Sequence, residues 1–305
     1  MNSTSLAPVA LFAYNRIEHL KLTISNLKKN SLSKFTDLII FSDNAKKSED
    51  IEKIIKIRSY LKKIKGFKKI FIVERNKNFG LSKNIINGVT LVLKKYKKII
   101  VLEDDLVVNK FFLKYMNQGL DLYKNNKEVA SIHAYVYPIP NLKNKIDNNT
   151  FFMRGADCWG WATWSRAWPN LNKNGKDLLK KIKKKKLIKN FNFNNSYDYY
   201  QMLQNQVDKK NDSWAIRWHA SCFLKNMFTL YPTTSLVKNI GIDKSGENSR
   251  FDLLNLGNKK FIKTNYKIKK QQIAESSIAR ELFEIFFRKK KFFRLKNIVK
   301  KILNV

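Results

Sequence analysis

The chain has 305 residues, 44% of them hydrophobic, and a formal net charge of +37. This length suits one large α/β domain, alone or with appended segments, better than two independent domains. No run approaches about 18 apolar residues, so we expect no transmembrane helix. The first eight residues lack the basic and apolar regions of a secretory signal.

Two cysteines, Cys158 and Cys222, are too few for a disulfide framework and are not spaced as a metal site, so a reducing cytoplasm is the simplest compartment. The positive charge attracts anions of any kind, including nucleic acid, acidic lipids and phosphorylated ligands. Lysine richness also follows from genome bias. Charge alone therefore decides no function.

Strands and helices alternate through the first 110 residues. Short apolar runs that do not alternate with polar residues are typical of strands covered on both faces, and they lie at 8–14, 37–42, 69–73 and 98–102. Apolar residues at three- and four-residue spacing predict amphipathic helices at 16–29, 50–64 and 81–95. This order predicts a mainly parallel sheet with right-handed crossovers.

Polar residues follow each predicted strand, at the edge where ligands of such sheets bind. They are Tyr14-Asn15-Arg16, Asp43-Asn44, Glu74-Arg75-Asn76 with 78–84, and Glu103-Asp104-Asp105. There is no Walker glycine loop and no G-x-G-x-x-G turn. ATP cleavage by a P-loop and dinucleotide binding therefore lose support.

The three consecutive carboxylates after the fourth run, Glu103-Asp104-Asp105, repel one another, and a cation relieves that repulsion most simply. A divalent ion held by one or two carboxylates, water and diphosphate oxygens is usual for phosphate substrates. Such an ion stabilises a leaving diphosphate as a Lewis acid. The alternative is a solvated turn in which Asp104 or Asp105 caps the next helix. The α/β register favours the metal site, with Asp105 as the ligand.

With these motifs the chain resembles the GT-A-fold glycosyltransferases. Within them it is similar to the branch typified by N-acetylglucosaminyltransferase I and to bacterial family-2-like glycan-assembly enzymes. The resemblance runs from about residue 8 to residue 242, in the same order. It implies an α/β, Rossmann-like GT-A fold with helices flanking a mainly parallel sheet. It also implies a nucleotide-sugar donor, with uridine as the base, and Mn²⁺ or Mg²⁺ as cofactor.

The resemblance assigns the carboxyl edge of the sheet to the donor. Asp105 matches the direct metal ligand, and Glu103 and Asp104 match acids that bind sugar and ribose hydroxyls. Asp43 matches an acid that contacts the uracil base. The other nucleotide-binding positions are Ala13, Tyr14, Asn15, Arg16 and Asn84; at the last of these the animal enzyme has a histidine.

The stretch 151–164 resembles the aromatic-glycine-tryptophan segment that lines the donor-sugar pocket of these enzymes. A glycine permits close backbone approach, and indole faces pack on the apolar face of a sugar. We therefore expect Gly160 and Trp161 to line that pocket. The alternative is that the tryptophans of this segment belong to the core.

An inverting transfer needs a carboxylate that takes the proton of the acceptor hydroxyl. By the resemblance this acid lies beside a tryptophan at the head of a helix, which fits Asp212, and Arg217 would then point toward the diphosphate. We expect Asp212 to cap that helix. Many relatives have an acid where this chain has Ala215, so Asp198 stays open as the rival base. The plain alternative for Asp212 is a cap alone, a role that Ser213 could share.

The last segments predict a lid and a membrane contact. A strand at 236–241 followed by the polar loop 243–249 resembles the family's mobile lid. Residues 277–305 read as an amphipathic helix, apolar on one face and basic on the other, as in helices that lie on anionic membranes. The alternative is a helix docked on the enzyme's own core with a solvated basic face.

We therefore predict an inverting, metal-dependent glycosyltransferase that transfers a sugar from a UDP-sugar to a lipid-linked bacterial surface glycan of the lipopolysaccharide or capsule type. It would be cytoplasmic, peripheral on the inner face of the cell membrane. A GT-A domain over 1–255 would comprise a nucleotide-binding half, 1–110, and a donor-sugar and acceptor half, 111–255, before a basic tail, 256–305. A sugar nucleotidyltransferase is the alternative enzyme. A basic nucleic-acid-binding protein is the non-enzymatic alternative, although we expect no specific nucleic acid partner because three adjacent acids repel phosphate.

Overall fold

The computed structural model describes residues 5–243 and 267–302, with the side chains of 293–302 excepted. Its centre is a sheet of eight strands in the order β3-β2-β1-β4-β8-β6-β9-β7. The strands are β1 (Val9–Ala13), β2 (Leu38–Ser42), β3 (Ile70–Glu74), β4 (Lys98–Glu103), β6 (Val129–His133), β7 (Thr150–Arg154), β8 (Trp161–Trp164) and β9 (Phe228–Pro232). β7 and β8 run opposite to the rest, so the sheet is mainly parallel, as predicted.

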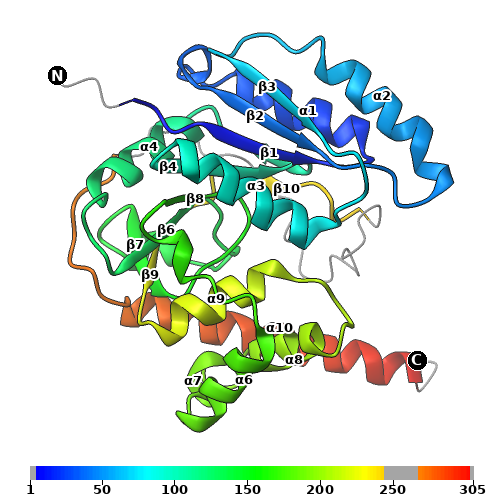
Figure 1. The fold of residues 1–305 in the computed structure, drawn as a ribbon. Helices are drawn as coiled ribbons and strands as arrows, with labels where there is room; N and C mark the ends of the chain where they lie inside the picture. The colour runs from blue at the N-terminus through cyan, green and yellow to red at the C-terminus, as the bar shows by residue number, and fades with distance from the viewer. Residues whose placement is uncertain (1–4, 244–266, 303–305) are drawn as a thin grey trace.

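Helices cover both faces of this sheet (Figure 1). The longer ones are α1 (Ile17–Lys28), α2 (Ile51–Leu61), α3 (Leu81–Lys95), α4 (Phe112–Leu122), α6 (Gly175–Lys184), α8 (Tyr199–Val207), α9 (Trp214–Leu224) and α10 (Ser277–Ile302). The short helices α5 (Leu142–Lys145) and α7 (Ile188–Phe191) lie in connections. α1 packs with α2, and α3 packs with α9. The right-handed crossovers place α1 and α2 on the face opposite α3.

The buried strands β1, β2 and β4 form because their β-branched and aromatic residues are covered by helices on both sides. β3 departs from that expectation. It is the edge strand of the sheet and is only partly buried, with Phe71 39% exposed. Periodicity could not reveal this, because the edge position depends on strand order.

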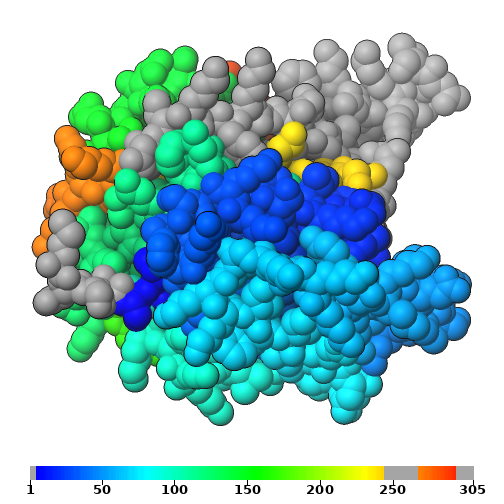
Figure 2. Space-filling model, turned by 90° about the horizontal axis from the view of Figure 1, so that it is seen from above, coloured from blue at the N-terminus to red at the C-terminus, as the bar shows by residue number. Residues whose placement is uncertain are grey.

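A second, two-stranded sheet lies beside the carboxyl end of β4. β5 (Leu106–Val108) follows the acidic turn directly, and β10 (Val237–Asn239) pairs with it in antiparallel register. Seen from above, blue residues of the N-terminal half adjoin the yellow segment that ends at residue 243 (Figure 2). The late strand of the chain therefore lies against the first loops of the sheet.

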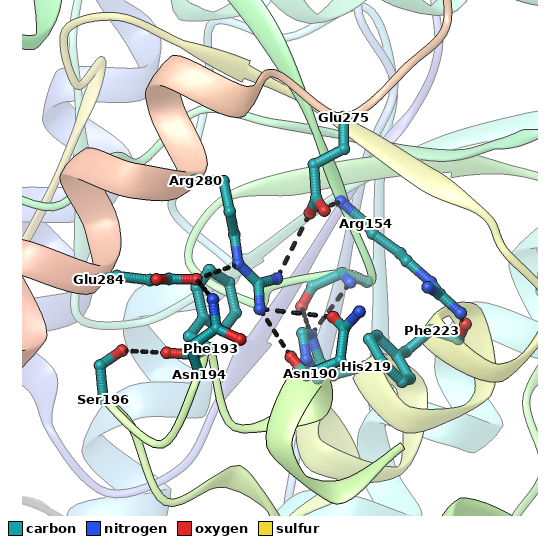
Figure 3. A network of polar contacts seen from close by, with 11 residues as sticks. Arg154, Asn190, Phe193, Asn194, Ser196, His219, Phe223, Glu275, Arg280 and Glu284 are labelled. Carbon is teal, nitrogen blue, oxygen red and sulfur yellow. Dashed lines mark hydrogen bonds and ion pairs between the residues drawn. The ribbon is translucent and has the colours of Figure 1, made fainter. Parts of the chain in front are cut away.

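The first three turns of α10 are docked on the enzyme's own core. Their buried residues Ala279, Phe283, Phe286 and Phe287 form one apolar cluster with side chains of β7 and β9. Polar contacts fix the same turns (Figure 3). Arg280 donates to Glu284 (2.8 Å) and to the backbone oxygen of Asn190 (2.7 Å) and lies over the ring of Phe193. Glu275 accepts from the backbone N–H of Arg154 at 3.0 Å.

In the part of the chain that the structure describes, no helix combines the length and apolarity needed to span a bilayer. Because Ala279, Phe283, Phe286 and Phe287 pack on β7 and β9, the docked-on-core alternative describes α10 as far as Phe287. The boundary drawn between a domain at 1–255 and a tail at 256–305 stays a prediction.

Candidate active site

The acidic turn joins β4 to β5 at the carboxyl edge of the sheet, beside the end of β1. Glu103 is in register with Phe12 of β1. Asp104 is buried, and its Oδ2 accepts the backbone N–H of Tyr14 at 3.1 Å. Thr23 of α1 donates its hydroxyl to the backbone oxygen of Asp104 at 2.8 Å. The turn is thus held from two sides by the first loop and the first helix.

Arg16 lies between the two aspartates of the turn. Its Nη2 is 2.6 Å from Asp104 Oδ1 and 2.8 Å from Asp105 Oδ2. The side chains of Arg16 and Asp105 are only 18% and 15% exposed, so water screens this contact weakly. The resemblance placed Arg16 at the nucleotide, and the structure adds a contact with the acids that motif spacing did not reveal.

Burial, together with the charges of Asp105 and Asp104, raises the pKa of Glu103 to about 8, against the opposing charge of Arg16. Burial also raises the pKa of Asp104, against the effect of Arg16. The pKa of Arg16 is lowered by burial, but the carboxylates of Asp104 and Asp105 outweigh this and raise it overall. At neutral pH the turn therefore holds a protonated Glu103 beside a charged guanidinium.

The segment after β10 closes over this contact. The backbone N–H of Ile240 donates to the backbone oxygen of Asp105 at 2.9 Å. A Cβ on Gly241 would come within 2.2 Å of Asp105 Oδ2 and 2.6 Å of Arg16 Nη1. Any larger residue there would have to displace the side chain of Asp105 or Arg16. Asp243 then pairs with His19 of α1 at 3.0 Å, and the rest of the predicted lid, 244–249, lies outside the described residues.

The loops after β1 and β2 are fixed by two acids. Tyr14 and Asn15 donate to Asp50, at 2.7 and 2.9 Å. The sequence reading missed Asp50, because it lies in a short 3₁₀ turn without a motif. Asp43 accepts the backbone N–H groups of Phe79 and Gly80, at 2.8 and 3.0 Å. Asp43 therefore shapes the loop that leads into α3, and Ala13 adds a backbone contact with it at 3.0 Å.

The start of α3 and the start of α9 meet at the same edge. Asn84 is buried and accepts from Arg75 Nε at 3.0 Å. Arg217, on α9, donates to the hydroxyl of Ser82 and to the backbone oxygen of Lys173 (3.2 Å). Arg217 is 9% exposed, so it joins two helix ends rather than reaching into solvent.

Asp212 does not cap α9, contrary to expectation. The cap is Ser213, whose hydroxyl accepts the backbone N–H of Ile216 at 3.3 Å. The side chain of Asp212 is 67% exposed, and its carboxylate lies 3.7 Å from Arg217. The same carboxylate would be 3.9 Å from a Cβ placed on Gly80.

Asp198 lies in a different environment. It precedes α8 without capping it, is 58% exposed, and pairs with Lys291 of α10 at 3.1 Å. Among the residues that the structure describes, Asp198 makes no hydrogen bond or ion pair with the acidic turn or the start of α3. The structure therefore groups Asp212, and not Asp198, with Gly80 and Arg217.

Gly160 and Trp161 were both expected to line the donor-sugar pocket; for Gly160 this stays a prediction. Gly160 has a φ of +68°, and a Cβ there would lie 2.7 Å from Val237 of β10, which requires glycine. The indole of Trp161 is fully buried and stacks on Trp214 at 5.2 Å. Trp161 is therefore a core residue and cannot lie on a sugar in this conformation. The partly buried Trp159 is the indole nearer the surface.

The loop before Gly160 adds an acid that the sequence reading did not single out. Asp157 is partly buried and accepts the backbone N–H of Cys158 at 2.7 Å. Burial raises the pKa of the Cys158 thiol, as do the charges of Asp157, Glu103 and Asp105. The loop thus lies close to the acidic turn. No motif marks this position, because only folding brings it there.

A preformed metal centre is not present in residues 5–243 and 267–302: no three His, Cys, Asp or Glu side chains converge there as one. The oxygen atoms present would suit a metal site in which the protein supplies only part of the coordination. The carboxylate of Asp105, against which Gly241 packs, would supply one hard oxygen ligand to a metal ion. Diphosphate and water oxygens would complete its coordination shell.

The sequence model described as glycosyl transferase family 2 matches residues 9–166. No curated protein matches the chain. Solved structures that resemble it include a mannosyltransferase from Pyrobaculum calidifontis in complex with GDP-Man and Mn²⁺, at 10% identity and a TM-score of 0.34, over 59% of this chain and 47% of that one. Another is S. aureus TarS, at 10% identity and a TM-score of 0.34, over 52% of this chain and 28% of that one. The chain spans less than half the length of either.

Proposed function

Because the chain belongs to glycosyl transferase family 2 and is a glycosyltransferase with a GT-A fold, we propose that it is an inverting, metal-dependent enzyme that uses a UDP-sugar. The observation that carries the proposal is the acidic turn at the end of β4, with Asp105 facing the guanidinium of Arg16. A cation and a carboxylate at the carboxyl edge of a parallel sheet suit a ligand that brings both metal and diphosphate.

The donor would lie over the ends of β1, β2 and β4. Tyr14 and Asn15, held by Asp50, shape one wall, and the loop held by Asp43 shapes another. Asp105 would hold Mn²⁺ or Mg²⁺, which when bound neutralises the leaving diphosphate. Glu103, protonated at neutral pH, can donate a hydrogen bond to a hydroxyl of the donor.

Asp212 is the base in this proposal. Its carboxylate is exposed and does not cap α9. Nη2 of its ion-pair partner Arg217 lies 3.7 Å from Oδ1 of Asp212. The carboxylate would take the hydrogen of the acceptor hydroxyl as that oxygen attacks the anomeric carbon. Asp198 is the rival, and its pairing with Lys291 disfavours it.

The acceptor in this proposal is a lipid-linked glycan of the lipopolysaccharide or capsule type, used at the cytoplasmic face of the cell membrane. Exposed apolar residues support a membrane contact. Ile278, Ile285 and Phe292 recur every seven residues along one face of α10 and are 47%, 40% and 67% exposed. Arg288, Lys289 and Lys291, on the same helix, are exposed as well. An apolar stripe beside lysines suits an anionic leaflet.

Release of UDP from a panel of UDP-sugars, measured with and without Mn²⁺, tests the proposed function. We expect Mn²⁺-dependent release with at least one donor, and its loss in Asp105→Ala. The Asp121→Ala variant is the control, because that acid pairs with Lys98 away from the acidic turn. Absence of hydrolysis and transfer with every donor, together with tight salt-sensitive RNA binding, would instead favour the nucleic-acid-binding alternative.

A further inference from the structure

The guanidinium of Arg16 lies on Oδ2 of Asp105, one of the two oxygens that a bound cation could use. Its Nη2 bridges oxygens of Asp104 and Asp105 at 2.6 and 2.8 Å. A divalent ion on a carboxylate oxygen sits about 2.0–2.2 Å from it. Two cations so close to the same Asp105 oxygen repel each other strongly in a partly buried site. Arg16 and the metal therefore compete for Asp105.

The surroundings make the arginine's position well defined. Thr23 and the backbone of Tyr14 hold Asp104, and Gly241 lies against both Asp105 and Arg16. The other terminal nitrogen of Arg16, Nη1, is buried without a hydrogen-bond partner among the described residues. An unpaired buried donor costs free energy. The two aspartates thus hold the guanidinium strongly through Nη2, while Nη1 has no hydrogen bond to the described residues.

The guanidinium of Arg16 would find other hydrogen-bond acceptors in a bound diphosphate. Diphosphate oxygens accept from guanidinium groups in the same forked geometry as carboxylates. A nucleotide bound at the end of β1 would offer Arg16 new acceptors, including one for Nη1. Release of Asp105 by Arg16 then opens the carboxylate to the metal.

On the basis of the proposed function, we infer that Arg16 is an exchangeable counter-cation that couples the two ligands: it withholds Asp105 from divalent metal until a nucleoside diphosphate draws its guanidinium away. Metal alone binds weakly, and metal and nucleotide bind cooperatively. Because linkage is reciprocal, Mn²⁺ raises the affinity for UDP by the factor by which UDP raises the affinity for Mn²⁺. Direct contact of Mn²⁺ with the diphosphate contributes to this factor, and the exchange of Arg16 adds a separate part.

The Arg16→Gln variant separates the part of the coupling due to exchange of Arg16 from the part due to direct contact of Mn²⁺ with the diphosphate. We measure Mn²⁺ binding by electron paramagnetic resonance and UDP binding by calorimetry, each with and without the other ligand. We expect Arg16→Gln to bind Mn²⁺ alone about tenfold more tightly than the wild type. The factor by which UDP enhances Mn²⁺ binding falls by a similar amount in the variant. Arg58→Gln is the control for the loss of one positive charge, because Arg58 pairs with Glu74 on α2 and β3.

Arg16→Lys provides a second variant in case the glutamine variant does not fold. It keeps the charge but lacks the fork that bridges both aspartates, and so gives an intermediate Mn²⁺ affinity and coupling. Equal Mn²⁺ affinity and equal coupling in the wild type and a folded Arg16 variant overturn the inference while leaving the proposed function intact. A wild type that binds no UDP, with Mn²⁺ or without it, overturns both.

Discussion

Gly241 lies so close to Asp105 that a Cβ on the glycine would come within 2.2 Å of the carboxylate Oδ2. The contact joins residues that are far apart in the chain, and the pairing of β10 with β5 brings them together. The segment after β10, which covers the candidate active site, therefore packs closely against Asp105. A side chain of any size at this position has to displace either the cover or the Arg16–Asp105 pair.

Gly241→Ala should therefore destabilise the protein. Overpacking of a closely fitted site costs about 1–3 kcal/mol, and each kcal/mol lowers the Tm of a chain of this size by roughly 2–4 °C. Thermal unfolding followed by circular dichroism measures the change. An unaltered Tm, together with unaltered UDP binding, would show that the segment moves away without cost.

Asp212→Asn should bind UDP and Mn²⁺ as the wild type does but lose turnover by about 10²-fold or more, the usual contribution of a general base. The amide keeps the shape of the side chain and cannot accept the proton. Asp198→Asn is the matched comparison, because its carboxylate is similarly exposed and pairs with Lys291. Single-turnover kinetics with the acceptor check both. Near-normal turnover in Asp212→Asn with loss in Asp198→Asn would reverse the assignment.

Phe292→Ser should weaken binding to anionic vesicles by about tenfold, the equivalent of ~1.4 kcal/mol, since burial of a phenylalanine is worth about 1.5–3 kcal/mol. Co-sedimentation with phosphatidylglycerol vesicles measures it, with phosphatidylcholine vesicles alongside. Phe35→Ser is the control, because Phe35 is 65% exposed, nearly as much as Phe292 at 67%, but lies far from α10 in the sequence. An equal effect of both substitutions, or of neither, would contradict a membrane contact through α10.

His219 should make stability depend on pH. Its ring stacks on Tyr199 at 4.4 Å, and burial lowers its pKa to about 4, the charge of Arg280 adding to this, while Ala156 and Asp157 oppose it. The unfolded histidine titrates near 6.5, so between pH 6.5 and 4 the unfolded chain binds the extra proton. The contribution is complete above pH 6.5 and is lost as the pH falls toward 4.

His219→Gln tests this, because glutamine does not titrate. Urea unfolding of the wild type should show a loss between pH 7 and pH 5 larger than that of the variant, by on the order of 1–3 kcal/mol. The substitution also removes packing, so the comparison concerns the pH dependence and not the stability at one pH. Parallel pH curves for the two proteins would rule out His219 as the source.

Much of the nucleotide-binding layer could be predicted from local pattern. The runs at 8–14 and 98–102 became β1 and β4, and the predicted helix at 81–95 has the observed bounds of α3. Apolar clustering and helical periodicity are properties of neighbouring residues. For that reason the sequence was sufficient for these elements, while the family was predicted from the resemblance of the motifs that follow the strands.

The candidate site was less predictable, because its contacts join distant parts of the chain. The Arg16–Asp104 and Gly241–Asp105 contacts depend on strand order and on the β5–β10 pairing. Trp161 was expected to line a pocket and is fully buried, since its surroundings are set by α9. The cap of α9 went to Ser213 instead of Asp212, a choice of one residue that propensity does not resolve.

The hydrogen bonds of Arg280 and Glu275 hold the start of α10 in place, so α10 has a fixed direction relative to the sheet. If the stripe from Ile278 to Phe292 meets a bilayer, the tilt of the whole enzyme follows from the direction in which this one helix leaves β7. A helix held in the membrane surface would then fix how far from the lipid the carboxylate of Asp212 lies, and so which part of a lipid-linked acceptor reaches it.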